Sequence, residues 1–234
     1  MTNSTPVEKP ELTLITTPRP SLTYKLVSYL LVFPIFRGLF RGCTYGNENV
    51  PQQGPVVVVA NHGSHLDPPI LGHALGRPVA FMAKAELFKI PLLGAIIRAC
   101  GAYPIKRGAS DREAIRMATA SLAEGWATGV FLDGTRQENG RVNAPMPGAA
   151  LLAARSGAPM LPVAIINSHR ALGSGSCWPR LIPIQLRIGK PIPAPLSRRK
   201  PDLEAATKEL QNQINALIDQ GLLSPKEKLQ RQGR

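Results

Sequence analysis

Apolar positions along the chain alternate between short β-branched runs and longer stretches with helical spacing. Short apolar runs bounded by glycine, proline or polar turns are typical of buried strands. We expect strands at residues 56–59, 79–82, 102–105, 130–132, 160–166 and 184–188, and helices at residues 68–75, 110–123, 149–155 and 202–220. Because strands alternate with helices, the pattern predicts an α/β fold in which helices flank a largely parallel β-sheet.

The two ends of the chain differ from this central pattern. Residues 1–20 are polar and contain several prolines, and we expect a disordered leader there. Residues 46–200 carry the alternating pattern and are expected to form the main domain. Residues 201–234 are expected to form a C-terminal helix and a tail, and the helix is predicted to be amphipathic because its apolar residues share one face.

Residues 21–45 are predicted to be an amphipathic, membrane-associated helical segment. Their uncharged apolar run, 26–36, is shorter than the roughly 20 residues that a spanning helix needs, and Pro34 is expected to break it. Basic residues flank the run without any acidic residue among them, which favours a segment lying in anionic lipid headgroups. A helix packed on the domain's own core fits the same residues, and that alternative stays open.

The net charge of +13 indicates an anionic partner, such as nucleic acid, a membrane surface, or a phosphorylated or CoA-like substrate. No RNA-binding or zinc-finger motif accompanies this charge, so we expect no nucleic-acid partner. The three cysteines are widely spaced and include no CxxC pair, which favours a reducing compartment over a disulfide framework or a structural zinc site.

Three of the four histidines lie close together after the first expected strand, in the stretch VVVVANHGSHLDPPIL and just beyond it. His62 and Asp67 are five residues apart, so on one helix they would point about 140° away from each other. They meet only if the backbone turns between them, and Gly63 and Ser64 favour such a turn. A carboxylate bonded to one imidazole nitrogen leaves the other nitrogen free as a general base.

Two other readings of this cluster are weaker. A zinc site made by His62, His65 and His73 lacks the HEXXH spacing and its glutamate, so we expect no metal. Ser64 is not surrounded by a G-x-S-x-G turn and is not expected to be a nucleophile. The pair would therefore activate a hydroxyl group of the substrate itself. His65 and His73 are expected to be structural.

Polar residues also follow two further strands, at 106–107 and 133–136, and sites in α/β sheets gather where strands end. Together these stretches resemble the glycerolipid acyltransferase family. NHGSHLDP resembles its H-x4-D motif, and the companion blocks follow in the family's order: AKAELFKIPLLG, GAYPIKRG, FLDGTR and LPVAI. The resemblance extends over roughly residues 54–195.

The resemblance implies that residues 46–200 form an acyltransferase catalytic domain. It implies that His62 acts as the base and that Asp67 orients it, while an acyl group moves from acyl-CoA or acyl carrier protein to the sn-2 hydroxyl of lysophosphatidic acid. No further cofactor is expected. The residues it implies for binding the substrate phosphate are Lys106, Arg107, Asp133, Gly134, Thr135 and Arg136. Leu132-Asp133 departs from the family's Pro-Glu.

Family members commonly carry an N-terminal hydrophobic helix embedded in one leaflet. The resemblance therefore implies a peripheral or monotopic protein on the cytoplasmic face of an anionic membrane, with acyl carrier protein as a possible partner. An acceptor other than lysophosphatidic acid, such as glycerol-3-phosphate, another lysophospholipid or an ornithine lipid, stays open. A non-catalytic lipid-binding protein is the alternative from a different class.

Overall fold

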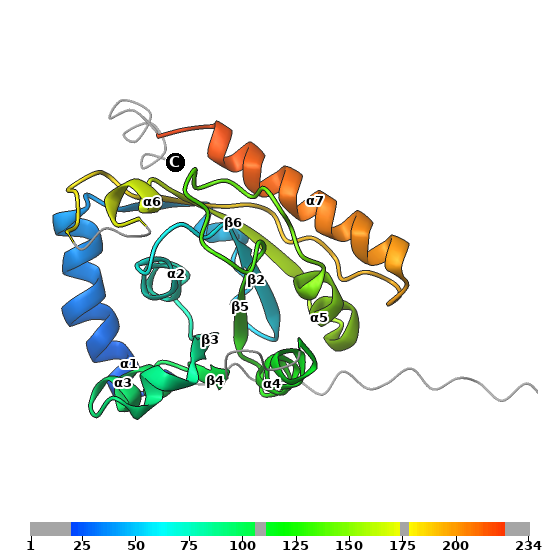
Figure 1. The fold of residues 1–234 in the computed structure, drawn as a ribbon, viewed down its shortest axis with the longest axis horizontal. Helices are drawn as coiled ribbons and strands as arrows, with labels where there is room; N and C mark the ends of the chain where they lie inside the picture. The colour runs from blue at the N-terminus through cyan, green and yellow to red at the C-terminus, as the bar shows by residue number, and fades with distance from the viewer. Residues whose placement is uncertain (1–19, 106–110, 174–177, 223–234) are drawn as a thin grey trace, which may run out of the picture.

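The computed structural model describes residues 20–105, 111–173 and 178–222 (Figure 1). Its centre is one seven-stranded sheet with the strand order β1-β7-β6-β2-β5-β3-β4. The strands are β1 Cys43–Tyr45, β2 Val56–Ala60, β3 Val79–Lys84, β4 Tyr103–Ile105, β5 Ala127–Phe131, β6 Met160–Ile166 and β7 Gln185–Ile188. Within the described residues only β6 and β7 pair antiparallel, which confirms the predicted largely parallel sheet.

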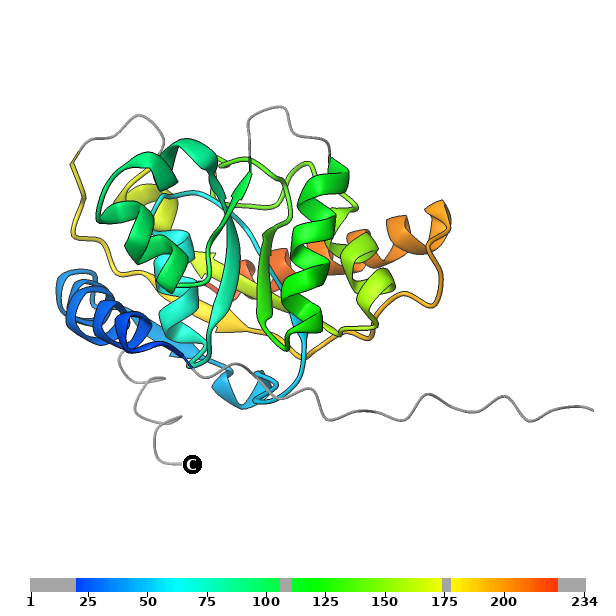
Figure 2. The same ribbon diagram turned by 90° about the horizontal axis from the view of Figure 1, so that it is seen from below.

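Helices cover both faces of this sheet (Figures 1 and 2). On one side α4, α5 and α7 pack against it, and on the other side lie α2 and a long helix near the N-terminus. The helices after β2 are α2 Asp67–Ala74, α3 Leu93–Ala99, α4 Asp111–Ala123, α5 Gly148–Ser156, α6 Ser168–Ala171 and α7 Lys200–Asp219. Two short 3-10 helices are η3 Asn47–Asn49 and η4 Ala85–Lys89.

Strand β2 is the fourth of the seven strands and is buried on both faces. Val56 and Val58 contribute to the core beneath α2, whereas Val57 and Val59 contribute to the core beneath α4, α5 and α7. Successive side chains of a strand point to opposite faces, so burial on both faces requires a continuous apolar run. This explains why the sequence before the histidines does not alternate.

The N-terminal helix consists of α1 Leu22–Leu26 followed by the π-helical turns η1 Val27–Val32 and η2 Pro34–Leu39. The expectation that Pro34 breaks it is wrong, because the helix runs through this residue. In the π-helical turns a backbone N–H bonds five residues back, as Phe40 does to the carbonyl of Ile35 at 3.0 Å. Such wide turns leave room for the proline ring and tolerate its missing N–H.

The same helix also packs on the domain. Phe36 and Phe40 are buried in the core shared with α2, and the chain continues directly into β1, which pairs with β7. Leu22–Leu39 is nevertheless long and apolar enough to cross a membrane by length and composition, and most of its residues are not buried. The packed-helix alternative is therefore confirmed for the inner side of the helix, whereas the lipid-facing prediction stays a prediction for its exposed side.

Other elements agree with the sequence patterns or lie close to them. β5 begins at Ala127 rather than at residue 130, because Thr128 and Gly129 are buried in the sheet despite their polar or small side chains. The short elements β1, α3 and α6 were not predicted, since each has seven residues or fewer and too little periodicity to detect. Residue 110, the expected first residue of α4, lies outside the described residues.

Candidate functional site

His62 and Asp67 meet at the carboxyl end of β2. The Nδ1–H of His62 donates to Oδ2 of Asp67 at 2.8 Å. The same oxygen accepts the backbone N–H groups of Gly63 and Ser64, each at 2.8 Å. The predicted turn thus exists. It is held by the carboxylate of Asp67, which is also the first residue of α2. Because Nδ1 is bound, Nε2 is the imidazole nitrogen left for proton transfer.

An aromatic stack fixes the plane of the imidazole. The His62 ring lies 3.9 Å from the ring of Phe131, centroid to centroid, at an interplanar angle of 13°. Phe131 stacks in turn on Phe81 at 5.9 Å. Gly129 leaves space for the Phe81 ring, because a Cβ at that position would lie 2.0 Å from it. The His62 side chain is 16% exposed, so the ring is held firmly and still reaches the surface.

Asn61 joins three segments at this point. Its side-chain amide donates to the carbonyls of Gly140 at 2.7 Å and Ile165 at 2.8 Å, and its Oδ1 accepts the N–H of Ile165 at 2.7 Å. The carbonyl of His62 accepts the N–H of Gln137 at 2.8 Å. These bonds bring the loop after β5 against the His62 turn. The sequence reasoning missed Asn61, although a polar residue between an apolar strand and a histidine is a usable signal.

The loop Gly134-Thr135-Arg136 follows β5, as predicted, and Gly134 takes the left-handed conformation with φ +67°. Asp133 is buried and accepts the backbone N–H groups of Asn143 at 3.1 Å and Ala144 at 2.7 Å. Burial raises the pKa of the Asp133 carboxyl, and these two hydrogen bonds partly oppose the shift. Within the described residues no ion pair joins Asp133 to Arg136. The Asp133 carboxylate instead binds the backbone where the loop ends, at residues 143 and 144.

The positive side chains of Arg136 and Lys84 lie near His65, three residues after His62. Burial lowers the pKa of His65, and the nearby charges of Arg136, His62 and Lys84 lower it further. Lys84 is the last residue of β3, next to β5 in the sheet, and the sequence reasoning did not single it out. Its position in the block AKAELFKIPLLG was the available signal. Lys106 and Arg107, which the resemblance implies for binding the substrate phosphate, lie outside the described residues.

Of the four histidines, His73 lies away from the site. His73 lies against the N-terminal helix, where Oγ of Ser28 is 2.8 Å from its Nδ1 and the rings of Tyr29, Phe33 and Phe36 surround it. Burial, followed by the charge of Arg37, lowers the pKa of His73. Its contacts agree with the structural role expected for it. In the described part of the chain no three His, Cys, Asp or Glu residues are grouped to hold a metal ion.

His169, which the sequence reasoning passed over, instead joins the site from α6. Its Cβ packs on Gly63, and its ring packs on Gly140, since a Cβ on either glycine would lie less than 3.0 Å from His169. Burial lowers the pKa of His169, the charge of Arg170 lowers it further, and Asp67 opposes both. Nothing in the local sequence connects residue 169 with residue 63.

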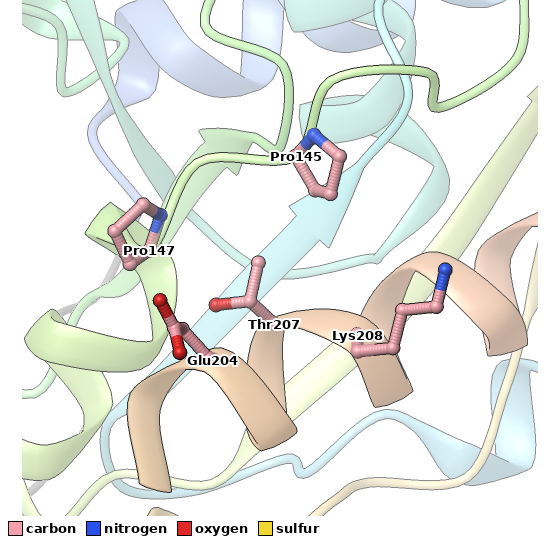
Figure 3. A pocket seen from close by; sticks show the side chains of 5 residues that line it. All are labelled: Pro145, Pro147, Glu204, Thr207 and Lys208. Carbon is pink, nitrogen blue, oxygen red and sulfur yellow. The ribbon is translucent and has the colours of Figure 1, made fainter. Parts of the chain in front are cut away.

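A separate shallow hollow lies between α7 and the segment 145–147 (Figure 3). Its lining residues are Pro145, Pro147, Glu204, Thr207 and Lys208. None of them belongs to the predicted site, and this hollow takes no part in the chemistry proposed below.

Comparisons with known proteins agree with this arrangement. A family model described as Acyltransferase matches residues 42–166, more than half of the chain. A chloroplastic 1-acyl-sn-glycerol-3-phosphate acyltransferase of Brassica napus is 29% identical over 155 residues, covering 65% of this chain and 44% of that protein. A lyso-ornithine lipid O-acyltransferase of Pseudomonas aeruginosa is 37% identical over 117 residues, covering 49% of this chain and 44% of that protein.

Among solved structures, the crystal structure of the 1-acyl-sn-glycerophosphate (LPA) acyltransferase from Thermotoga maritima is similar, with a TM-score of 0.73 and 27% identity. The similarity covers 86% of this chain and 81% of that one. The chain spans about half the length of the curated relatives it matches. The predicted family and fold class are confirmed.

Proposed function

Because the chain belongs to the Acyltransferase family, we propose that it transfers a fatty acyl group from an acyl thioester to the sn-2 hydroxyl of lysophosphatidic acid, which gives phosphatidic acid. The observation that carries the proposal is the hydrogen-bonded pair of His62 and Asp67 with Nε2 left for proton transfer. Two of the relatives' names support the acceptor, since they denote acyl transfer to 1-acylglycerol phosphate.

In the proposed mechanism, Nε2 of His62 removes the proton of the acceptor hydroxyl as its oxygen attacks the thioester carbonyl. The resulting tetrahedral intermediate collapses, the C–S bond breaks, and the leaving thiolate accepts the proton from Nε2. Asp67 stabilises the imidazolium that forms between these steps, because its Oδ2 keeps the bond to Nδ1 throughout. The proton of the acceptor hydroxyl thus leaves with the thiol product, and His62 is free to act as a base in the next turnover.

A direct transfer without an acyl-enzyme is supported by the state of Ser64. This side chain is buried, and its Oγ accepts the N–H of Leu66 at 3.1 Å. A serine held inside the turn is poorly placed to attack a substrate carbonyl. The acceptor hydroxyl is therefore the nucleophile in the proposed reaction.

The substrate phosphate is proposed to bind between the Gly134-Thr135-Arg136 loop and the end of β3. Arg136 and Lys84 supply the positive charge, and both lie close enough to His65 to lower its pKa. An arginine can bind two phosphate oxygens at once. Lys106 and Arg107 are proposed to complete this site. Asp133, expected from the resemblance to contribute to substrate binding, is proposed to do so by fixing the loop backbone at residues 143 and 144.

The donor is proposed to be acyl-CoA or acyl carrier protein, both strongly anionic and therefore attracted by a chain of net charge +13. No further cofactor is required by this mechanism. Such donors occur in the cytoplasm, and we propose that the protein works on the cytoplasmic face of a membrane.

The test is turnover of lysophosphatidic acid and an acyl thioester by the purified chain. His62→Ala is expected to abolish phosphatidic acid formation, whereas Ser64→Ala is expected to retain most of it. A fully active His62→Ala protein would overturn the proposed base. An acyl-enzyme that accumulates in the wild type and is absent from Ser64→Ala would overturn direct transfer.

A second acceptor is favoured by the similarity to the lyso-ornithine lipid O-acyltransferase, which reaches 37% identity. A panel of lysophosphatidic acid, lyso-ornithine lipid, glycerol-3-phosphate and other lysophospholipids distinguishes the candidates by kcat/KM. Vesicle binding without turnover of any acceptor would instead support a non-catalytic lipid-binding protein.

A further inference from the structure

The outer side of the N-terminal helix carries an unusual number of exposed large apolar side chains. Its inner side is anchored, because Phe36 and Phe40 are buried in the core. The exposed large apolar residues of the helix are Leu22, Leu26, Tyr29, Leu30, Leu31, Phe33 and Leu39, of which Tyr29 and Phe33 also contact His73 of α2. Contiguous exposed apolar surface of this kind marks an interaction site rather than ordinary protein surface.

A second exposed apolar group adjoins the beginning of this helix. It lies on η4 and α3 and on the segment between them, and it consists of Leu87, Ile90, Leu92 and Leu93. Leu92 is 75% exposed and has the positive φ of 59°, so the backbone turn there presents its side chain to solvent. Oγ of Ser21 donates to the carbonyl of Ala99 at 3.1 Å, which ties the start of the helix to the end of α3.

A third group adjoins the other end of the helix. Trp178 is 83% exposed, and Leu181 is also exposed. The guanidinium of Arg41 donates to the carbonyl of Leu181 at 3.2 Å, and the N–H of Ile184 donates to the carbonyl of Phe40 at 3.1 Å. In Figures 1 and 2 the N-terminal helix, α3 and the segment after α6 lie along the same side of the molecule.

The charges around these three segments are almost all positive. Across residues 20–42, 85–99 and 178–184, Glu86 is the one acidic residue. The basic residues in the same stretches are Lys25, Arg37, Arg41, Lys89, Arg98 and Arg180. A second copy of the chain would bring the same positive surface and be repelled, whereas anionic lipid headgroups complement both the charge and the apolar side chains.

We propose that these three segments form one docking face for an anionic lipid bilayer, with Leu92 and Trp178 inserting into the interface at opposite ends of the N-terminal helix. Tryptophan suits this position because its ring is amphipathic and is enriched at membrane interfaces. The lipid contact proposed here extends beyond the N-terminal helix. Only its purpose, which is to supply a lipid acceptor to the site, rests on the proposed function.

The docking face is rigidly connected to the site. The hydroxyl of Tyr24 donates to the carbonyls of Gly72 at 2.9 Å and Arg77 at 3.1 Å, and Ser28 bonds to His73. Gly72 and His73 belong to α2, whose first residue is Asp67. A bilayer that binds the docking face therefore holds the dyad in one orientation relative to the lipid surface.

The test compares flotation of the full chain with vesicles of phosphatidylcholine alone and with an equal mixture of phosphatidylcholine and phosphatidylglycerol. The double variant Leu92→Gly/Trp178→Ser keeps the N-terminal helix intact, and glycine accepts the positive φ at position 92. Its partitioning onto the mixed vesicles is expected to fall at least about tenfold. Leu196→Ser removes another fully exposed leucine, 104% exposed and just before α7, and is expected to bind as the wild type does.

Equal partitioning of the double variant and the wild type would overturn the proposal. So would an equal loss of partitioning in Leu196→Ser, or a wild type that binds neither kind of vesicle. Thermal unfolding checks that each variant is folded, and Leu181→Ser provides an independent variant of the same face. Turnover of a short-chain, water-soluble acceptor is measured in parallel. Wild-type protein that binds vesicles without turnover would refute the proposed function and leave the docking face standing.

Discussion

Replacing Gly63 by alanine tests whether the His62 turn depends on its contact with His169. A Cβ at position 63 would lie 2.6 Å from Cβ of His169 and 3.2 Å from its Cα and N. Carbon atoms in ordinary contact are about 3.5–4.0 Å apart, so the misfit is about 1 Å. The opposing atoms are backbone and Cβ, which no side-chain rotation removes. The turn between His62 and Asp67 must therefore shift.

This shift is expected to damage the reaction more than the fold. The N–H of Gly63 donates to the same Asp67 oxygen that orients His62, so displacement of the turn misplaces the base. A misplacement of about 1 Å can cost about 100-fold in rate, and we expect kcat to fall by about that factor. Overpacking of a well-packed site costs about 1–3 kcal/mol in the free energy of unfolding. Steady-state kinetics and urea unfolding measure the two effects.

The control is Gly148→Ala, because a Cβ at that position meets no atom within 4 Å. It is expected to leave kcat unchanged. His169→Gly removes the opposing Cβ. The double variant Gly63→Ala/His169→Gly is therefore expected to lose less activity than the combined losses of the two single variants predict. Wild-type kcat in Gly63→Ala would refute the reasoning, as would strictly additive effects in the double-mutant cycle.

Three further predictions concern single side chains. Asp67→Asn keeps the shape but removes the charge that stabilises the imidazolium, and stopped assays should show kcat lower by about 100- to 10,000-fold. Arg136→Ala should raise KM for the phosphate acceptor about 10- to 100-fold with little change in kcat, whereas Arg141→Ala, which removes an ion pair to Asp219 instead, should not. Because folding lowers the pKa of His73, its contribution to stability is complete above the unfolded pKa of about 6.5 and is lost as the pH falls toward the folded pKa. The free energy of unfolding should therefore decrease from pH 7 to pH 5, with a smaller slope in His73→Gln.

The sequence by itself determined the longer strands and helices, the family and the meeting of His62 with Asp67. Each of these depends on local patterns: continuous apolar runs, helical spacing, and a glycine and a serine between two reactive side chains. The carboxyl ends of parallel strands lie at one edge of a sheet, so polar residues that follow β2 and β5 are brought together by topology alone.

The tertiary structure decided what surrounds that pair. Gly63 was expected only as a turn residue, yet it is also required for the close approach of His169, more than 100 positions away along the chain. Asn61 reaches Ile165 across a similar separation, and His73 of α2 packs against the N-terminal helix rather than contributing to the site. Contacts between residues so far apart leave no periodic or local signature, because they depend on how finished elements pack and not on which elements form.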